Sequence, residues 1–174
     1  MDHGNVSHVL TTERLILRPV TTADHAALLA HWTASDVREF LFDGEVLSPS
    51  AISRVIEDSE RDFGAAGYGL WLVFEAGDKQ MPGLAGTAGL RPLEDLGIEI
   101  LYSLAAGARG KGYATEAAGA VIDYALGVLG LPEVLAEIDA GNQASAAVVA
   151  RLGMRPFDVV PGLLGPMTRY RRTR

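Results

Sequence analysis

A short segment in the second half of the chain combines glycines with cations, since Arg109, Gly110, Lys111 and Gly112 stand in a row. It follows the apolar run 97–104, which predicts a strand, and precedes apolar residues at three- and four-residue spacing, which predict a helix from Gly112 onward. A glycine-rich turn at a helix start leaves backbone N–H groups free at the positive end of the helix dipole. Such a turn suits an anion, and a diphosphate in particular.

Other nucleotide-binding motifs fit this segment less well. No Ser or Thr follows a Gly-Lys pair at the spacing of a phosphate-binding P-loop, and Thr115 stands where a dinucleotide fingerprint needs glycine. The remaining alternative is an ordinary strand-to-helix turn with solvated Arg and Lys side chains. The segment alone leaves that alternative open.

The elements that must position this turn follow from hydrophobic periodicity and capping signals. Ser48 with Pro49, Thr22 and Asn142 are the expected helix starts, and Gly153 is an expected stop. In chain order, the pattern predicts strand 14–20, helices within 21–32 and 47–67, strands 68–77, 82–92 and 97–104, helix 112–129, strand 133–139, helix 141–153, and strands 154–160 and 167–173. This order predicts an α+β fold with one mixed sheet, in a single domain spanning 1–174.

Composition narrows the function classes. The chain has 174 residues, a net charge of −7 and no cysteine, which excludes disulfides, thiolate metal sites and a cysteine nucleophile. We expect no metal site, no nucleic-acid partner and no membrane segment. The net charge is negative and no apolar run approaches the length of a membrane span. The arginines at 169, 171, 172 and 174 could form a basic patch, but their alternation is more typical of the solvated side of a terminal strand. A cytoplasmic location is the expectation that fits this composition.

Several segments together resemble the GNAT superfamily of N-acetyltransferases, and its RimJ/RimL-like branch in particular. RGKGYA at 109–114 is similar to the family's (Q/R)-x-x-G-x-(G/A) acetyl-CoA signature. LTTERLILRPVTTAD at 10–24, IEILYSLA at 98–105 and EIDAGNQASAAVVARLGMRPF at 137–157 resemble the same branch in the same order. The resemblance covers about residues 10 to 158.

The resemblance implies a mixed, mostly antiparallel sheet flanked by helices and splayed between its fourth and fifth strands, here 97–104 and 133–139. The pantetheine arm of acetyl-CoA would lie in that gap. The cofactor-binding positions implied by the family are the backbone of Leu104 and Ala105, the N–H groups of Arg109, Gly110, Lys111, Gly112, Tyr113 and Ala114, and the side chain of Asn142, which is also a plain helix cap.

Two side chains carry the chemistry that the resemblance implies. Glu99 matches a glutamate common in the family and is the candidate base for the acceptor amine, directly or through water. Ser145 matches the serine of the branch's N-x-x-S and is the candidate acid for the leaving thiolate, since the tyrosine that many members carry in this helix is missing here. The alternatives are a partly exposed strand carboxylate for Glu99 and a first-turn hydroxyl for Ser145.

The acceptor pocket departs from the branch pattern. Leu101 replaces a small residue, Ser103 replaces a tryptophan, and 107–109 replace a bulky acidic-aromatic corner. His31 and Trp32 fall in the region that borders the acceptor site in this family, although a core or surface position is the alternative for each.

The leading hypothesis is an acetyl-CoA-dependent N-acetyltransferase. It would transfer an acetyl group to a protein N-terminus or a small primary amine by direct attack in a ternary complex, as a monomer or homodimer. The acidic net charge favours a cationic acceptor. The alternative is a non-catalytic acyl-CoA-binding or sensor protein, which would have no reason to keep Glu99 and Ser145 together.

Overall fold

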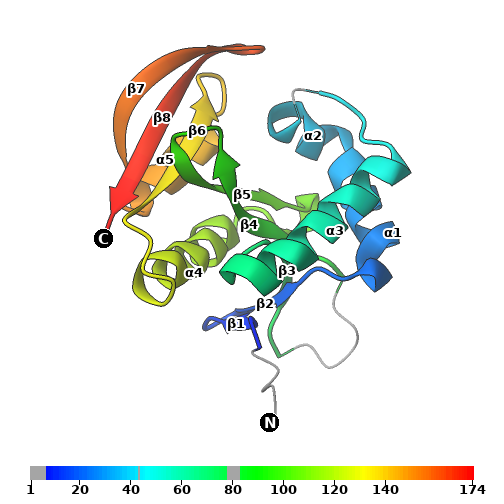
Figure 1. Ribbon diagram of the computed structural model, residues 1–174. Coiled ribbons are helices and arrows are strands. Elements are labelled where there is room, and N and C mark those ends of the chain that lie inside the picture. Colours follow the sequence, from blue (N-terminus) through cyan, green and yellow to red (C-terminus); the bar gives the residue numbers. More distant parts are fainter. Residues whose placement is uncertain (1–6, 43, 78–82) are drawn as a thin grey trace.

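The centre of the fold is one twisted sheet, seen in Figure 1. The computed structural model describes residues 7–42, 44–77 and 83–174, and within them the sheet has eight strands in the order β1-β2-β3-β4-β5-β6-β8-β7. Their bounds are β1 Leu10–Thr11, β2 Leu15–Pro19, β3 Leu70–Glu75, β4 Gly86–Leu93, β5 Gly97–Leu104, β6 Glu133–Asp139, β7 Arg155–Gly162 and β8 Gly165–Thr173. All neighbours pair antiparallel except β5 and β6, which pair parallel. The predicted fold class is confirmed.

Helices cover both faces of the sheet and enclose two hydrophobic cores. They are α1 His25–Thr33, α2 Ser35–Leu41, α3 Pro49–Ala66, α4 Tyr113–Gly127 and α5 Gln143–Arg151, with short 3-10 turns at Thr22–Asp24 and Ala106–Ala108. In β3, Trp71 and Val73 belong to the core under α4 and α5, while Leu70 and Leu72 belong to the core under α1–α3. Alternate side chains of a strand point to opposite faces, so β3 needs apolar residues throughout.

The sheet opens between β5 and β6. Register pairs run along the whole of β4 and β5, whereas β5 and β6 share the single pair Glu99 with Leu135. Beyond that pair the two parallel strands share no further register pair with each other in the described structure. β5 and β6 are the strands predicted as fourth and fifth, and the expected gap lies between them.

Local capping explains where several elements begin and end. The Ser48 side chain accepts a hydrogen bond from the Ala51 N–H at 3.1 Å, Pro49 is the first helical residue of α3, and Gly67 ends the helix at φ 79°. These predictions are confirmed, as is β6 over 133–139.

Other local expectations were incomplete. Thr22 is not the cap of the first helical segment; Thr21 takes that place, in a reciprocal capping box with Asp24. The two-residue strand β1 and helix α2 were not predicted. α2 follows α1 directly at Ala34, where the backbone is extended, and no glycine or proline marks that break in the sequence. No helix in the described ranges is long and apolar enough to cross a membrane.

Candidate active site

The edge of β5 that faces β6 directs backbone N–H and C=O groups into the gap. The Ala105 N–H donates to Ala85 O at 2.8 Å, on the β4 side. Backbone groups in an antiparallel strand alternate between its two edges, so Tyr102 and Leu104 direct their N–H and C=O toward β6. Leu104 is therefore oriented as its predicted role needs. Ala105 is already bonded on both groups, because its carbonyl also accepts from the Ala108 N–H at 2.9 Å.

The glycine-rich turn after β5 has the backbone of an anion cradle. Gly110 and Gly112 have φ values of 77° and 80°, a left-handed conformation that favours glycine. Gly112 is the N-cap of α4, and the bond from the Glu116 N–H to Gly112 O, 3.1 Å, is the first of the helix. The N–H groups of residues 113–115 precede it and have no acceptor within the helix. They can bind an anion.

The two cations of the turn are held beside it by carboxylates. Arg109 pairs with Asp36 at 3.1 Å and also donates to Leu104 O at 3.3 Å. Lys111 Nζ lies 3.4 Å from Glu75 Oε1. All four side chains are more than 40% exposed, so these pairs are weak and can exchange partners. Arg109 thereby links the end of β5 to the first turn of α2.

Contacts from the N-terminal segment hold the turn and the first residues of α4 in place. The Glu116 carboxylate accepts from the Thr12 hydroxyl at 2.6 Å, from the Arg14 N–H at 2.9 Å and from Arg14 Nε at 2.7 Å. Arg14 also donates to Lys111 O at 2.7 Å, and its guanidinium lies 4.8 Å from the ring centre of Tyr113, whose side chain is buried. We call Thr12, Arg14 and Glu116 the clamp. The sequence gives no signal for it, because its members lie about a hundred residues apart.

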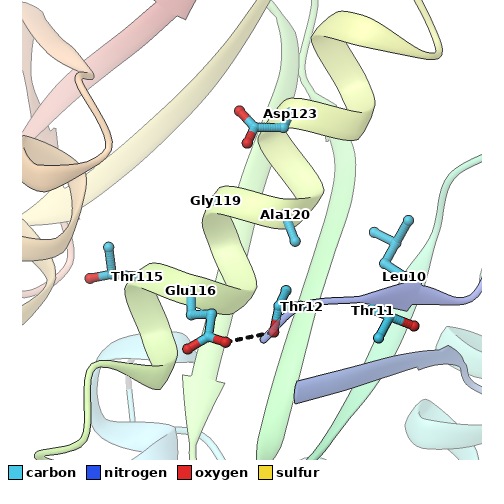
Figure 2. Close-up of a pocket in the computed structure, with 8 residues that line it drawn as sticks. All are labelled: Leu10, Thr11, Thr12, Thr115, Glu116, Gly119, Ala120 and Asp123. Carbon is cyan, nitrogen blue, oxygen red and sulfur yellow. Dashed lines mark hydrogen bonds between the residues drawn. The ribbon is translucent and has the colours of Figure 1, made fainter. Parts of the chain in front are cut away.

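A surface pocket of about 450 Å³ lies beside the clamp, between β1 and α4 (Figure 2). It is lined by Leu10, Thr11, Thr12, Thr115, Glu116, Gly119, Ala120 and Asp123. None of these residues belongs to β5, β6 or the turn 109–112. The pocket is therefore separate from the gap that the backbone of β5 lines.

Glu99 lies at the closed end of the gap, on the face of the sheet that α1–α3 cover in part. Its side chain is 7% exposed and bonds Arg91 Nε at 2.7 Å. Burial raises the pKa of Glu99 above its ordinary value, and the charge and hydrogen bond of Arg91 oppose that rise. The nearby Glu137 adds to the rise, while Arg169 lowers it. Glu99 is thus a buried carboxylate with a raised pKa, and the Arg91 guanidinium limits that rise.

Asn142 and Ser145 begin α5 as predicted, with Asn142 Oδ1 accepting from the Ser145 N–H at 3.1 Å. Tyr102 reaches the same turn from β5, and its hydroxyl donates to Ser145 O at 3.4 Å. Burial raises the pKa of Tyr102, opposed by that hydrogen bond. Sequence reasoning looked for a tyrosine in this helix and overlooked one on the facing strand.

A chain of hydrogen bonds lies on the α1 side of β5. Trp32 Nε1 donates to Thr87 Oγ1 at 3.3 Å, Thr87 Oγ1 lies 2.7 Å from Ser103 Oγ, and Ser103 Oγ lies 2.8 Å from His31 Nε2. Trp32, His31 and Thr87 are buried, and Ser103 is partly exposed. Burial lowers the pKa of His31 to about 4, an effect that the charge of Asp36 opposes and that of Arg109 reinforces. His31 and Trp32 are therefore both buried, and Trp32 belongs to the core under α1–α3, the alternative position considered for it.

Several known proteins are similar to this chain in fold or sequence. The structure superimposes on an acetyltransferase from Agrobacterium tumefaciens with a TM-score of 0.79 and 27% identity, over 95% of this chain and 94% of that one. It resembles the Vibrio cholerae spermidine N-acetyltransferase, solved with CoA and spermine, at a TM-score of 0.75 and 15% identity over 93% and 96% of the chains. The Bacillus subtilis protein YkkB is 28% identical over 171 residues, 97% of each chain.

The family model for the acetyltransferase (GNAT) domain matches residues 14–155. That range includes the clamp's Arg14 and Glu116, all of the turn 109–114, and both strands of the gap. Ribosomal-protein acetyltransferases also occur among the similar folds, alongside members with other acceptors. This chain belongs to the GNAT family of acetyltransferases.

Proposed function

We propose that this chain, acting as one domain over 1–174, is an N-acetyltransferase that moves the acetyl group of acetyl-CoA to a primary amine in a ternary complex. The observation that carries the proposal is the presence of two sets of backbone donors, the N–H groups of Tyr102 and Leu104 on the β5 edge and those of residues 113–115 at the start of α4. Between the two sets, the N–H groups of Ala105, Ala108 and Arg109 are already bonded within the chain. Amides at the strand edge suit the pantetheine arm, and the helix start suits the pyrophosphate. A thioester held in this way supplies the electrophilic acetyl carbon.

The side chains around the gap fit the remaining steps. The Glu99 carboxylate removes a proton from the incoming ammonium through water, because it lies at the closed end of the gap. An N–H group of Tyr102 or Leu104 polarises the thioester carbonyl. Ser145, at the start of α5, donates a proton to the leaving thiolate. Asn142 holds the pantetheine while it caps α5.

The acceptor is a cationic amine, either the α-amine of a protein or a small polyamine-like molecule. The net charge of −7 favours a cation in the encounter step. The resemblance of 10–24 and 137–157 to the RimJ/RimL-like branch supports a protein N-terminus. The altered pocket residues Leu101 and Ser103 support an acceptor different from those of the ribosomal-protein enzymes.

The test is release of free thiol from acetyl-CoA in the presence of N-terminal peptides, polyamines and aminoglycosides, each with the purified full chain. We expect turnover with at least one class. Acetyl-CoA binding by calorimetry together with no turnover on any acceptor would instead support the acyl-CoA-binding alternative.

Variants sharpen the assignment of roles. Glu99→Gln and Ser145→Ala should each lower kcat by about 100-fold or more, the usual contribution of general acid–base catalysis. Glu57→Gln, an exposed carboxylate of α3, is the matched control and should leave kcat unchanged. Equal rates for Glu99→Gln and Glu57→Gln would remove Glu99 from the mechanism.

A further inference from the structure

The direction of the hydrogen bonds in the chain from Trp32 to His31 can be worked out from its ends. An indole N–H can only donate, so Thr87 Oγ1 accepts from Trp32. The hydroxyl proton of the buried Thr87 then points to Ser103 Oγ, and the Ser103 proton points to His31 Nε2. In this arrangement the Trp32, Thr87 and Ser103 donors each have an acceptor within the chain of hydrogen bonds. His31 is the neutral tautomer with its proton on Nδ1, which is consistent with its lowered pKa.

With the hydrogen bonds directed in this way, Ser103 Oγ keeps one lone pair that no group of the chain of hydrogen bonds uses. Ser103 Oγ donates once and accepts once within the chain, and its side chain is partly exposed. On β5 it stands between Tyr102 and Leu104, whose N–H groups face the gap. An amine that attacks a thioester carbonyl held by either N–H group must approach within about 3.5 Å of the acetyl carbon. From the α1 face of the strand, Ser103 is the nearest polar side chain of β5.

Glu99 is too distant to share this role directly. It lies on the same face of β5 but four residues away, which is about 13 Å along a strand. Acetylation of an ammonium removes two protons from nitrogen, one before attack and one after it. Glu99 can take the first through water, but the second must leave from the nitrogen already bonded to the acetyl carbon.

We propose that Ser103 and His31 form a proton relay that takes this second proton from the acceptor nitrogen. The inference rests on the proposed N-acetyltransferase function. As the N–H bond breaks, Ser103 Oγ gains that proton and passes its own to His31 Nε2. The C–N bond has then formed, the C–S bond breaks with its electron pair on sulfur, and the thiolate is protonated by Ser145.

The environment of His31 suits a short-lived proton acceptor. The charged groups whose fields act on His31 are Asp36 of α2, which stabilises the imidazolium, and Arg109 of the turn, which opposes it. A weak base is sufficient here, because a nitrogen that carries a positive charge after attack is far more acidic than a free ammonium. The same weakness keeps His31 neutral, and so able to accept, throughout the physiological pH range.

The experiment compares kcat of His31→Gln, Ser103→Ala and the double variant, using the panel acceptor with the highest kcat/KM. We expect each single variant to lose about 100-fold in kcat, the double variant to lose no more than either, and acetyl-CoA affinity by calorimetry to stay within about threefold. Ser103→Thr keeps the hydroxyl and should restore most of the rate. His25→Gln, in the same helix, is the matched control.

The outcomes separate this inference from the proposed function. Unchanged kcat in both single variants, or losses that multiply in the double variant, would overturn the relay while leaving the acetyltransferase intact. The relay also requires the solvent deuterium isotope effect on kcat to change in His31→Gln, which a purely structural role of the histidine would not produce. Absence of turnover by the unaltered protein with every acceptor would overturn both.

Discussion

Replacing Gly112 tests whether the turn before α4 holds the pyrophosphate. Gly112 has φ 80° and ψ 11°, and a Cβ there would meet Arg14 Nη2 at 3.4 Å, a contact that a flexible side chain tolerates. The left-handed backbone costs an ordinary residue about 1–2 kcal/mol, and less for Asn and Asp. Gly112→Asn and Gly112→Asp should therefore both fold, with melting temperatures lowered by a few degrees.

The difference between the two variants isolates charge. Two unit charges about 4 Å apart repel by about 4 kcal/mol near a protein surface. Exposure to salt and the nearby Arg14 reduce this to about 2 kcal/mol, or about 30-fold in the dissociation constant. Calorimetry with CoA should show Gly112→Asp binding about 30-fold more weakly than Gly112→Asn, with the difference shrinking as salt rises.

Equal affinities of the Asn and Asp variants for CoA would refute the placement of a phosphate at this turn. Equal melting temperatures are required for the comparison, since a fold defect in one variant would weaken binding for another reason. The unaltered protein provides the reference for the cost of any side chain at this position.

Three further predictions follow from the hydrogen bonds and charges described above. Glu116→Gln should cost about 1–3 kcal/mol of unfolding free energy and weaken CoA binding. Burial acts to raise the pKa of Glu116, but its hydrogen bonds to Thr12 and Arg14 outweigh this and lower it, so the stability difference should be full above pH 4.5 and vanish as pH falls through the lowered pKa. Arg91→Gln removes a charge that holds the raised pKa of Glu99 down, so the acid limb of the kcat–pH profile should move to higher pH. Ser59→Ala removes the 2.8 Å acceptor of the buried Leu70 N–H and should cost about 1–3 kcal/mol in denaturant unfolding.

Each of these predictions has an internal control or a contrary outcome. Ser53→Ala, in the same helix as Ser59, removes a partly exposed hydroxyl and should change stability by less than about 0.5 kcal/mol. An acid limb that does not move in Arg91→Gln would show that another group sets it. A stability difference for Glu116→Gln that persists at pH 3 would mean that packing, and not the carboxylate charge, is what the residue provides.

The elements that were predictable from sequence are those with local signals. Residues 49–66 form α3 because a serine cap, a first-turn proline and an apolar stripe agree, and β5 and β6 begin and end where their apolar runs do. The turn at Gly110 and Gly112 was predictable as well, because the ability to adopt a positive φ is a property of glycine itself.

What escaped prediction depends on contacts between distant segments. Arg14 contacts Glu116 across 102 positions, Tyr102 meets Ser145 across 43, and His31 meets Ser103 across 72. No local sequence pattern predicts such pairs, because each partner also fits the helix, strand or turn in which it lies without the contact. The family resemblance indicated Glu99 and Ser145 as candidates but not the residues beside them, and it marked Ser103 only as a departure from the branch pattern.

The strand order has a consequence for how the chain acquires its shape during synthesis. β8 lies between β6 and β7, although it follows both in sequence. Until residues 165–173 have left the ribosome, β6 has a bare edge on one side and a single register pair with β5 on the other. The β6 side of the gap therefore becomes fixed only when β8 inserts, so a nascent chain stopped after β7 would present its β6 edge to any other strand within reach.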